Sequence, residues 1–145
     1  MSASAQRIYF LLQIAAHQMK KAADARLIDA ANLSTAQAAV LILVAESEPV
    51  TQKFLADRLK QNESAMTAMV NRLLKLGYLT RHRSESDGRA WQLRTTRKGK
   101  AALEKMRKPF GRINGKLDAR LSEKEIANLA KSLKTVIAAF EADES

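Results

Sequence analysis

The chain has 145 residues, of which 25 are Lys or Arg and 15 are Asp or Glu, so its formal net charge is +10. A chain of this length is expected to form one domain, which buries a core without disulfide or metal staples. The sequence contains no cysteine, which excludes disulfides, thiolate metal sites and cysteine nucleophiles. His17 and His82 are too few for a zinc cluster, and we expect no metal site and no cofactor.

Gly and Pro together number only seven, which is typical of a mostly helical protein. No apolar run reaches the roughly 18 residues that a membrane span needs. The longest candidate, Ile8 to Met19, is interrupted by polar side chains. The N-terminus lacks a convincing cleavage site, so we expect it to belong to the fold; a transit peptide is the alternative, because residues 2–23 contain no acid. We expect no membrane partner.

All of the excess charge lies in one stretch. Residues 51–110 hold 15 basic and 5 acidic residues, whereas the rest of the chain holds 10 of each. Such a concentration indicates a polyanionic partner. A solvated basic face without a partner is the alternative, and an anionic lipid surface is disfavoured because the stretch is not one amphipathic helix.

Four helices are predicted in the first half of the chain. An apolar stripe over 6–30 predicts the first helix, and Asn32 suits its left-handed end. Ser34 or Thr35 caps a second helix, apolar on nearly all sides, that stops before Pro49. A third helix over 51–59 is expected to bury Phe54, Leu55 and Leu59. A fourth helix over 63–76, capped by Asn62, is expected to turn five apolar residues inward: Met66, Met69, Val70, Leu73 and Leu74.

After Gly77 the pattern changes to two short strands, 78–83 and 90–95, around a polar turn. From Thr96 a long helix runs toward residue 118, and Pro109, Gly111 and Gly115 predict a kink or break in it. Ser122, with Glu125 three residues later, caps a last amphipathic helix.

The helix pair 51–59 and 63–76 has helix-turn-helix proportions, and the hairpin that follows makes a winged helix. Polar side chains of the second helix point away from its apolar face, where they can meet bases and phosphates: Ser64, Thr67, Asn71, Arg72 and Lys75. An ordinary helical hairpin with a polar face is the alternative.

Arginines flank the turn of the hairpin. Arg81 and Arg83 precede it, and Asp87-Gly88-Arg89 lies within it. Arginines at a hairpin tip suit the narrow, electronegative minor groove, and Asp87 can orient Arg89. A tight turn with a surface ion pair is the alternative.

These residues resemble the multiple antibiotic resistance regulators, the MarR family of winged-helix transcription factors. The resemblance covers residues 33–99 by motif. It is carried by an ordered set: Leu33-Ser34-Thr35, Gln37, Leu41, Leu55-Ala56, Leu59, Ser64, Val70, Leu73, Gly77-Tyr78-Leu79, Arg81, Asp87-Gly88-Arg89, Thr96 and Gly99.

The resemblance implies a mainly helical α+β fold in three parts. These are an N-terminal dimerisation helix (1–33), a winged helix (34–99, with the reading helix about 63–76 and the wing about 78–95) and C-terminal dimerisation helices (100–145). Apolar stripes on the terminal helices, longer than one small core can cover, independently favour a homodimer, although packing of these helices within one chain is the alternative.

By similarity, three groups of residues would contact double-stranded DNA. The reading helix would contribute Asn62, Ser64, Ala65, Thr67, Ala68, Asn71 and Arg72. The wing would contribute Arg81, Arg83, Ser86, Asp87 and Arg89. Candidate phosphate contacts are Ser34, Thr35, Gln52, Lys53 and Lys75.

The resemblance further implies a cytoplasmic, nucleoid-associated repressor of a prokaryote that is released from a pseudo-palindromic site by a small aromatic or phenolic anion. His17 is the candidate effector residue, and a packed or solvated histidine is its alternative. The lack of cysteine removes the peroxide-sensing branch of the family. No phosphate-binding loop, carboxylate pair or nucleophile motif is present, so we expect no enzyme. A low-specificity architectural DNA-binding protein and a winged-helix protein-interaction module are the alternatives.

Overall fold

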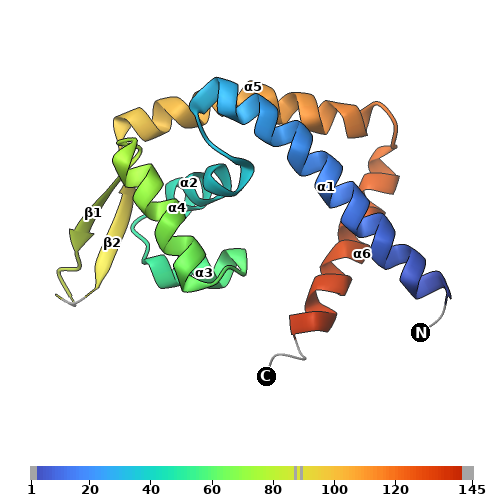
Figure 1. The fold of residues 1–145 in the computed structure, drawn as a ribbon, viewed down its shortest axis with the longest axis horizontal. Coiled ribbons are helices and arrows are strands. Elements are labelled where there is room, and N and C mark those ends of the chain that lie inside the picture. Colours follow the sequence, from blue (N-terminus) through green and yellow to red (C-terminus); the bar gives the residue numbers. More distant parts are fainter. Residues whose placement is uncertain (1–2, 87, 89, 142–145) are drawn as a thin grey trace. The chain divides into compact units, whose positions relative to one another are not determined.

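The computed structural model of the chain describes residues 3–86, 88 and 90–141. Asp87 and Arg89, both assigned to the wing, lie outside the described residues. In chain order the elements are α1 (Ala3–Ala31), α2 (Thr35–Ser47), α3 (Gln52–Leu59), α4 (Glu63–Lys75), β1 (Leu79–Arg83), β2 (Trp91–Thr95), α5 (Arg97–Asp118) and α6 (Glu123–Glu141) (Figure 1). The predicted mainly helical class with one small sheet is confirmed.

Local capping sets most of the helix limits. The hydroxyl oxygen of Ser34 accepts a bond from the Gln37 backbone, whose side chain in turn accepts one from the Ser34 N–H, which is a complete capping box. Asn62 caps α4 by accepting from the backbone of Ala65, 2.7 Å away. Ser122 and Glu125 form the predicted pair at the start of α6.

The core gathers around α2, as its apolar character on nearly all sides predicts. Side chains from α1, α2, α3, α4 and the hairpin are buried there, among them Leu27, Leu41, Leu55, Met66, Leu73 and Leu93. The expectation that Phe54 is buried is wrong, because its side chain is 36% exposed. The eight-residue α3 turns Leu55 and Ala56 to the core, and Phe54 lies one position, about 100°, away from that face.

The two strands form an antiparallel hairpin in which Leu79 faces Thr95 and Arg83 faces Trp91. A bridge that the sequence did not reveal joins Val50, just before α3, to Leu93 through two backbone hydrogen bonds of 2.7 and 3.2 Å. The middle of β2 is therefore fixed to the segment that leads into the helix-turn-helix.

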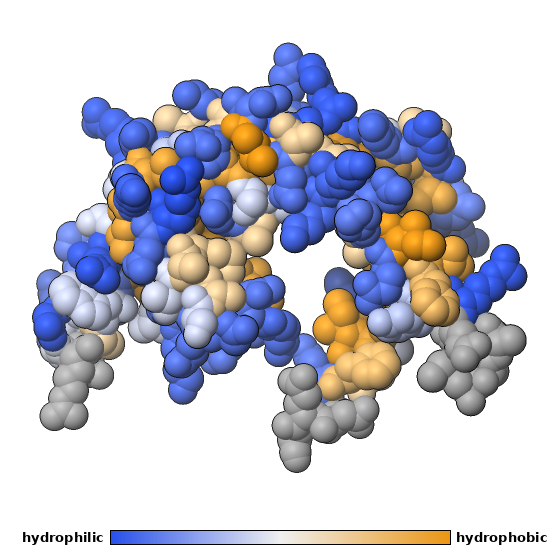
Figure 2. All heavy atoms as spheres, in the orientation of Figure 1, coloured by the Kyte–Doolittle hydropathy of each residue, from blue (hydrophilic) through white to orange (hydrophobic). Residues whose placement is uncertain are grey.

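Helix α5 is assigned as one helix through Pro109, so the predicted break is absent from it. The chain nevertheless divides within this helix, after Pro109, into two compact units, residues 1–109 and 110–145. No residue of α6 is buried, and Leu129, Val136, Ile137 and Phe140 are exposed on it. Figure 2 shows apolar side chains exposed over the C-terminal part of this helix. The three-part domain division remains a prediction.

No single helix within the described ranges is both long and apolar enough to cross a bilayer. Helices α1 and α2, bent by 66° at the break between them, meet the criteria of length and composition only when they are taken together.

Candidate nucleic-acid interface

Helices α3 and α4 are joined by a tight turn and pack against each other. Lys60 takes a left-handed conformation (φ 52°) at the end of α3, and the Gln61 N–H donates to the Ala56 carbonyl. Asn62 then starts α4. This local chemistry makes the two helices a helix-turn-helix, as the spacing of the sequence predicts.

The predicted reading-helix residues lie mostly on the solvent side of α4. Asn62, Ser64, Thr67, Ala68 and Asn71 are exposed, whereas Ala65 and Arg72 are half-buried. The opposite side is buried through Met66, Val70 and Leu73. The helix therefore presents small and amide side chains outward on a rigidly packed support.

One hydrogen bond links two of the candidate residues. The Gln52 Nε2 atom, in the first turn of α3, donates to the Thr67 hydroxyl over 2.6 Å, and that hydroxyl donates to the Glu63 carbonyl. Gln52 therefore braces the outer face of α4. Lys53, beside it, and Lys75, at the end of α4, are exposed.

Ser34 and Thr35 are already engaged within the protein. Ser34 caps α2, and Thr35 donates both its N–H (2.6 Å) and its hydroxyl (2.5 Å) to the Asp24 carboxylate on α1. These bonds from Thr35, the hydroxyl first, lower the pKa of Asp24. Ser34 thus stabilises the start of α2, Thr35 joins α2 to α1, and the phosphate contact of both residues remains a prediction.

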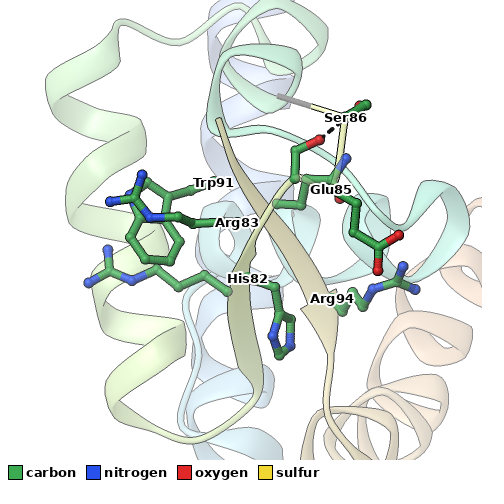
Figure 3. Close-up of a pocket in the computed structure, with 9 residues that line it drawn as sticks. His82, Arg83, Glu85, Ser86, Trp91 and Arg94 are labelled. Carbon is green, nitrogen blue, oxygen red and sulfur yellow. Dashed lines mark hydrogen bonds between the residues drawn. The ribbon is translucent and has the colours of Figure 1, made fainter. Parts of the chain in front are cut away.

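The hairpin carries two different faces. Arg81, Arg83 and Trp91 share one face, while His82, Gln92 and Arg94 share the other. Figure 3 shows Arg83 beside Trp91 on one side and Arg94 on the other. An open depression of about 890 Å³ is lined by residues 81–86, 91, 92 and 94.

Near the turn, the guanidinium of Arg83 donates to the Gly88 carbonyl over 2.5 Å. The hydroxyls of Ser84 and Ser86 lie 3.0 Å apart, and Ser86 is exposed. Arg83 therefore bonds to Gly88 within the turn, a contact that sequence spacing alone did not indicate.

Trp91 is the residue that the sequence analysis missed. Its ring lies 4.7 Å from the Cζ of Arg83 and 5.2 Å from that of Arg81, and 45% of its surface is exposed. Trp91 faces Arg83 in the strand register. The signal available in the sequence was a lone tryptophan that alternates with Leu93 in a strand next to two arginines.

The structure divides the basic stretch into two equal parts. Residues 51–96, from α3 to the end of the hairpin, hold nine basic and four acidic residues, and residues 97–110 hold six basic and one acidic residue. Half of the excess charge therefore lies on the first turns of α5, outside the reading helix and the wing.

The effector candidate His17 is exposed on α1. Exposed apolar side chains precede and follow it on the same helix: Ile8, Tyr9, Phe10, Leu11, Ile14 and Met19. No group of three or more His, Asp or Glu residues suited to a metal ion occurs in the described part of the chain.

Comparison with known proteins agrees with this architecture. Residues 31–90 match the sequence profile of the MarR family. The organic hydroperoxide resistance transcriptional regulator of Bacillus subtilis is 29% identical over 131 residues, which cover 90% of this chain and 87% of that protein. The names of such relatives describe regulators rather than enzymes, in agreement with the expectation from the sequence.

Two solved structures share the fold. The MepR–DNA complex of S. aureus superposes with a TM-score of 0.81 at 19% identity, covering 96% of this chain and 98% of that one. A MarR mutant from E. coli, complexed with operator DNA, gives 0.82 at 24% identity, covering 90% and 93%. Residues 31–90 of the chain are therefore similar in sequence to the MarR family, and the chain shares the winged-helix fold of these two solved structures.

Proposed function

We propose that the chain is a homodimeric transcriptional repressor that binds pseudo-palindromic duplex DNA. The observation that carries this proposal is the occurrence of two exposed surfaces on one compact unit, residues 1–109. One surface is the outer side of α4, with Ser64, Thr67 and Asn71. The other is the hairpin face that bears Arg81 and Arg83.

The chemistry of each surface suits a different part of the duplex. Hydroxyl and amide groups on an exposed helix can reach base edges in the major groove. Arginines on a hairpin suit phosphates and the narrow minor groove. Lys53 and Lys75 would contact the backbone, and Arg89, oriented by Asp87, would enter the minor groove. That the MepR and MarR structures hold DNA supports the assignment of a duplex as the partner.

Exposed apolar side chains on the terminal helices support the dimer. Residues of α1 between Ile8 and Met19 and residues of α6 between Leu129 and Phe140 are exposed. Exposed apolar side chains gathered along a helix in this way are typical of an interface. Two-fold symmetry would then place two reading helices about 34 Å apart, or about 10 base pairs.

A small aromatic or phenolic anion is the effector class that we propose, with His17 as a candidate contact. The Bacillus subtilis relative is named for organic hydroperoxide resistance. A thiol-based peroxide sensor is excluded in these 145 residues because they contain no cysteine.

Selection of bound duplexes from a random pool tests the proposal. We expect recovery of an inverted repeat with a preference of roughly a thousandfold or more over random DNA. Tight binding without a recovered motif would instead show an architectural DNA-binding protein. No binding to any duplex at low salt would show a winged helix that serves protein interaction.

A further inference from the structure

The indole ring of Trp91 makes cation–π contacts with two arginines, Arg81 and Arg83, on one face of the hairpin. Arg83 lies directly opposite Trp91 in the register and Arg81 lies diagonally, opposite Leu93. Both guanidinium carbons are within the cation–π range of about 6 Å from the ring centroid. Figure 3 shows the Arg83 side chain running alongside the ring.

Among the described residues, no carboxylate forms an ion pair with Arg81 or Arg83. The ion pair found there joins Arg107 to Glu104 on α5. Two like charges on one ring repel each other, so an anion that meets both would be strongly attracted. All three side chains are exposed. The pair is therefore a preformed cationic site that solvent, and any approaching polyanion, can reach.

This site faces the helix-turn-helix. A narrow depression of about 240 Å³ adjoins it, lined by Arg81, Trp91 and Leu93 from the hairpin and by Thr51, Gln52 and Val70 from the helical side. Gln52 is the residue that braces Thr67 on α4. The stacked arginines and the exposed side of α4 thus border the same surface.

We infer that Trp91 is a positioning residue for DNA binding, which holds Arg81 and Arg83 ready for the phosphate backbone of the duplex bound by α4. The inference rests on the proposed function. An arginine loses rotamer freedom when it binds a phosphate, and an arginine already stacked on a ring has less freedom to lose. Trp91 therefore raises affinity without itself reading a base.

A plain packing role for Trp91 makes a different prediction. If the ring only covered Leu93, any apolar side chain of similar size would serve, and the effect of its loss would not depend on the arginines. The two roles are separated by comparing Trp91→Phe, which keeps an aromatic face, with Trp91→Leu, which keeps apolar bulk alone.

The first experiment measures affinity for the selected duplex by fluorescence anisotropy in two backgrounds, wild type and Arg81→Gln/Arg83→Gln. In the wild-type background we expect Trp91→Leu to weaken binding about tenfold and Trp91→Phe less than about threefold. In the Arg81→Gln/Arg83→Gln background we expect Trp91→Leu to change affinity less than about twofold. Equal losses in both backgrounds, with unfolding curves unchanged, would overturn the inference.

The second experiment requires no DNA. Trp91 is the only tryptophan of the chain, so tryptophan fluorescence, excited selectively over that of the tyrosines, reports on this site alone. We expect iodide to quench it more strongly than caesium, and we expect the ratio of the two quenching constants to fall in Arg81→Gln/Arg83→Gln. An unchanged ratio of quenching constants would contradict the stacking of Arg81 and Arg83 on Trp91. If the ratio falls as expected but the wild-type chain binds no duplex, the proposed function fails, and with it the role of the stack in DNA binding.

Discussion

Gly99, in the first turn of α5, lies where the backbone of the hairpin approaches most closely. A Cβ atom at this position would come 2.2 Å from the Tyr78 carbonyl oxygen and 2.9 Å from Cγ2 of Thr95. That carbonyl accepts a bond from the Thr96 N–H, and the Thr96 hydroxyl donates to Gly77, so the backbone is tied in place. Only glycine fits without a shift of the main chain.

We therefore expect Gly99→Ala to destabilise the protein by about 1–3 kcal/mol, measured by urea unfolding, because the added methyl overpacks a fixed backbone. Gly111→Ala is the matched control in the same helix. Its Cβ meets nothing within 4 Å, so gain of helix propensity should stabilise by about 0.5–1 kcal/mol. A neutral Gly99→Ala variant would contradict the close approach.

Asp24 makes the joint between α1 and α2 sensitive to acid. Its pKa is lowered by the hydroxyl and the N–H of Thr35. A group with a depressed folded-state pKa contributes stability above its unfolded pKa, about 3.9, and that contribution disappears as the pH falls through the folded value. We expect Asp24→Asn to destabilise the protein at pH 7, and we expect this loss to be smaller at pH 3, which lies below the unfolded pKa.

Asp29→Asn supplies the comparison for this measurement. Asp29 is exposed on the same helix, and the structure records no hydrogen bond to its carboxylate. Its replacement should leave the unfolding free energy nearly unchanged at both pH values. A pH-independent loss on Asp24→Asn would indicate that packing, rather than the charged hydrogen bonds, carries its effect.

Among the helices, the N-terminus of α2 is where Ser34 has two candidate roles, helix capping and contact with a DNA phosphate. The hydroxyl caps the helix, and the capping box is complete without any ligand. Replacement of such a cap by alanine costs about 1 kcal/mol. We expect Ser34→Ala to lose about this stability, seen in thermal unfolding, while affinity for the selected duplex changes less than about twofold.

Ser34→Thr retains the capping oxygen and should restore most of the stability. If Ser34→Ala instead weakens DNA binding tenfold with little change in unfolding, the phosphate contact predicted from the resemblance is the correct role.

Elements whose limits depend on neighbours in sequence were predictable. Asn62 caps α4 through a residue three positions away, and Ser122 with Glu125 does the same for α6. Asn32 and Gly77 take the left-handed conformation expected at helix ends, with φ of 56° and 76°. These signals are local because one turn of helix brings the partners together.

Contacts between distant segments were not predictable in this way. The Tyr78 hydroxyl donates to the Ala31 carbonyl across 47 positions, and Val50 bridges Leu93 across 43 positions. The stacking of Trp91 requires that Arg81, Arg83 and Trp91 lie on the same face of the hairpin. The strand register, which the sequence does not reveal, decides this. Residue types near the candidate site were therefore visible in the sequence, whereas the bonds that hold Gln52, Arg83 and Trp91 were not.

At the scale of the whole molecule, the apolar face of α6 is the feature that a dimer would explain. Ile137 is 57% exposed and lies in a helix without a buried residue. We expect Ile137→Glu to shift the protein toward the monomer, measured by size-exclusion chromatography with light scattering, because a charge is costly in an apolar interface. Lys131→Glu, on the same helix but outside its apolar stripe, should remain dimeric. A monomeric wild-type chain would refute the proposed assembly.

The division of charge between the wing and α5 gives a last test of which face meets DNA. Figure 1 shows the first turns of α5 on the side of the winged helix opposite to α3. A duplex held by α4 and the hairpin would then release counterions from contacts with Arg81 and Arg83, and not from Lys105 or Lys108 on α5.

The slope of log affinity against log salt concentration measures these contacts, at about 0.9 for each phosphate neutralised on duplex DNA. We expect Arg81→Gln/Arg83→Gln to reduce the magnitude of this slope by about 2 for the selected duplex. Lys105→Gln/Lys108→Gln removes the same charge and should leave the slope nearly unchanged. Net charge alone would make the two double variants equivalent, so an equal reduction would show that the duplex also reaches α5, and that the basic stretch acts as one surface.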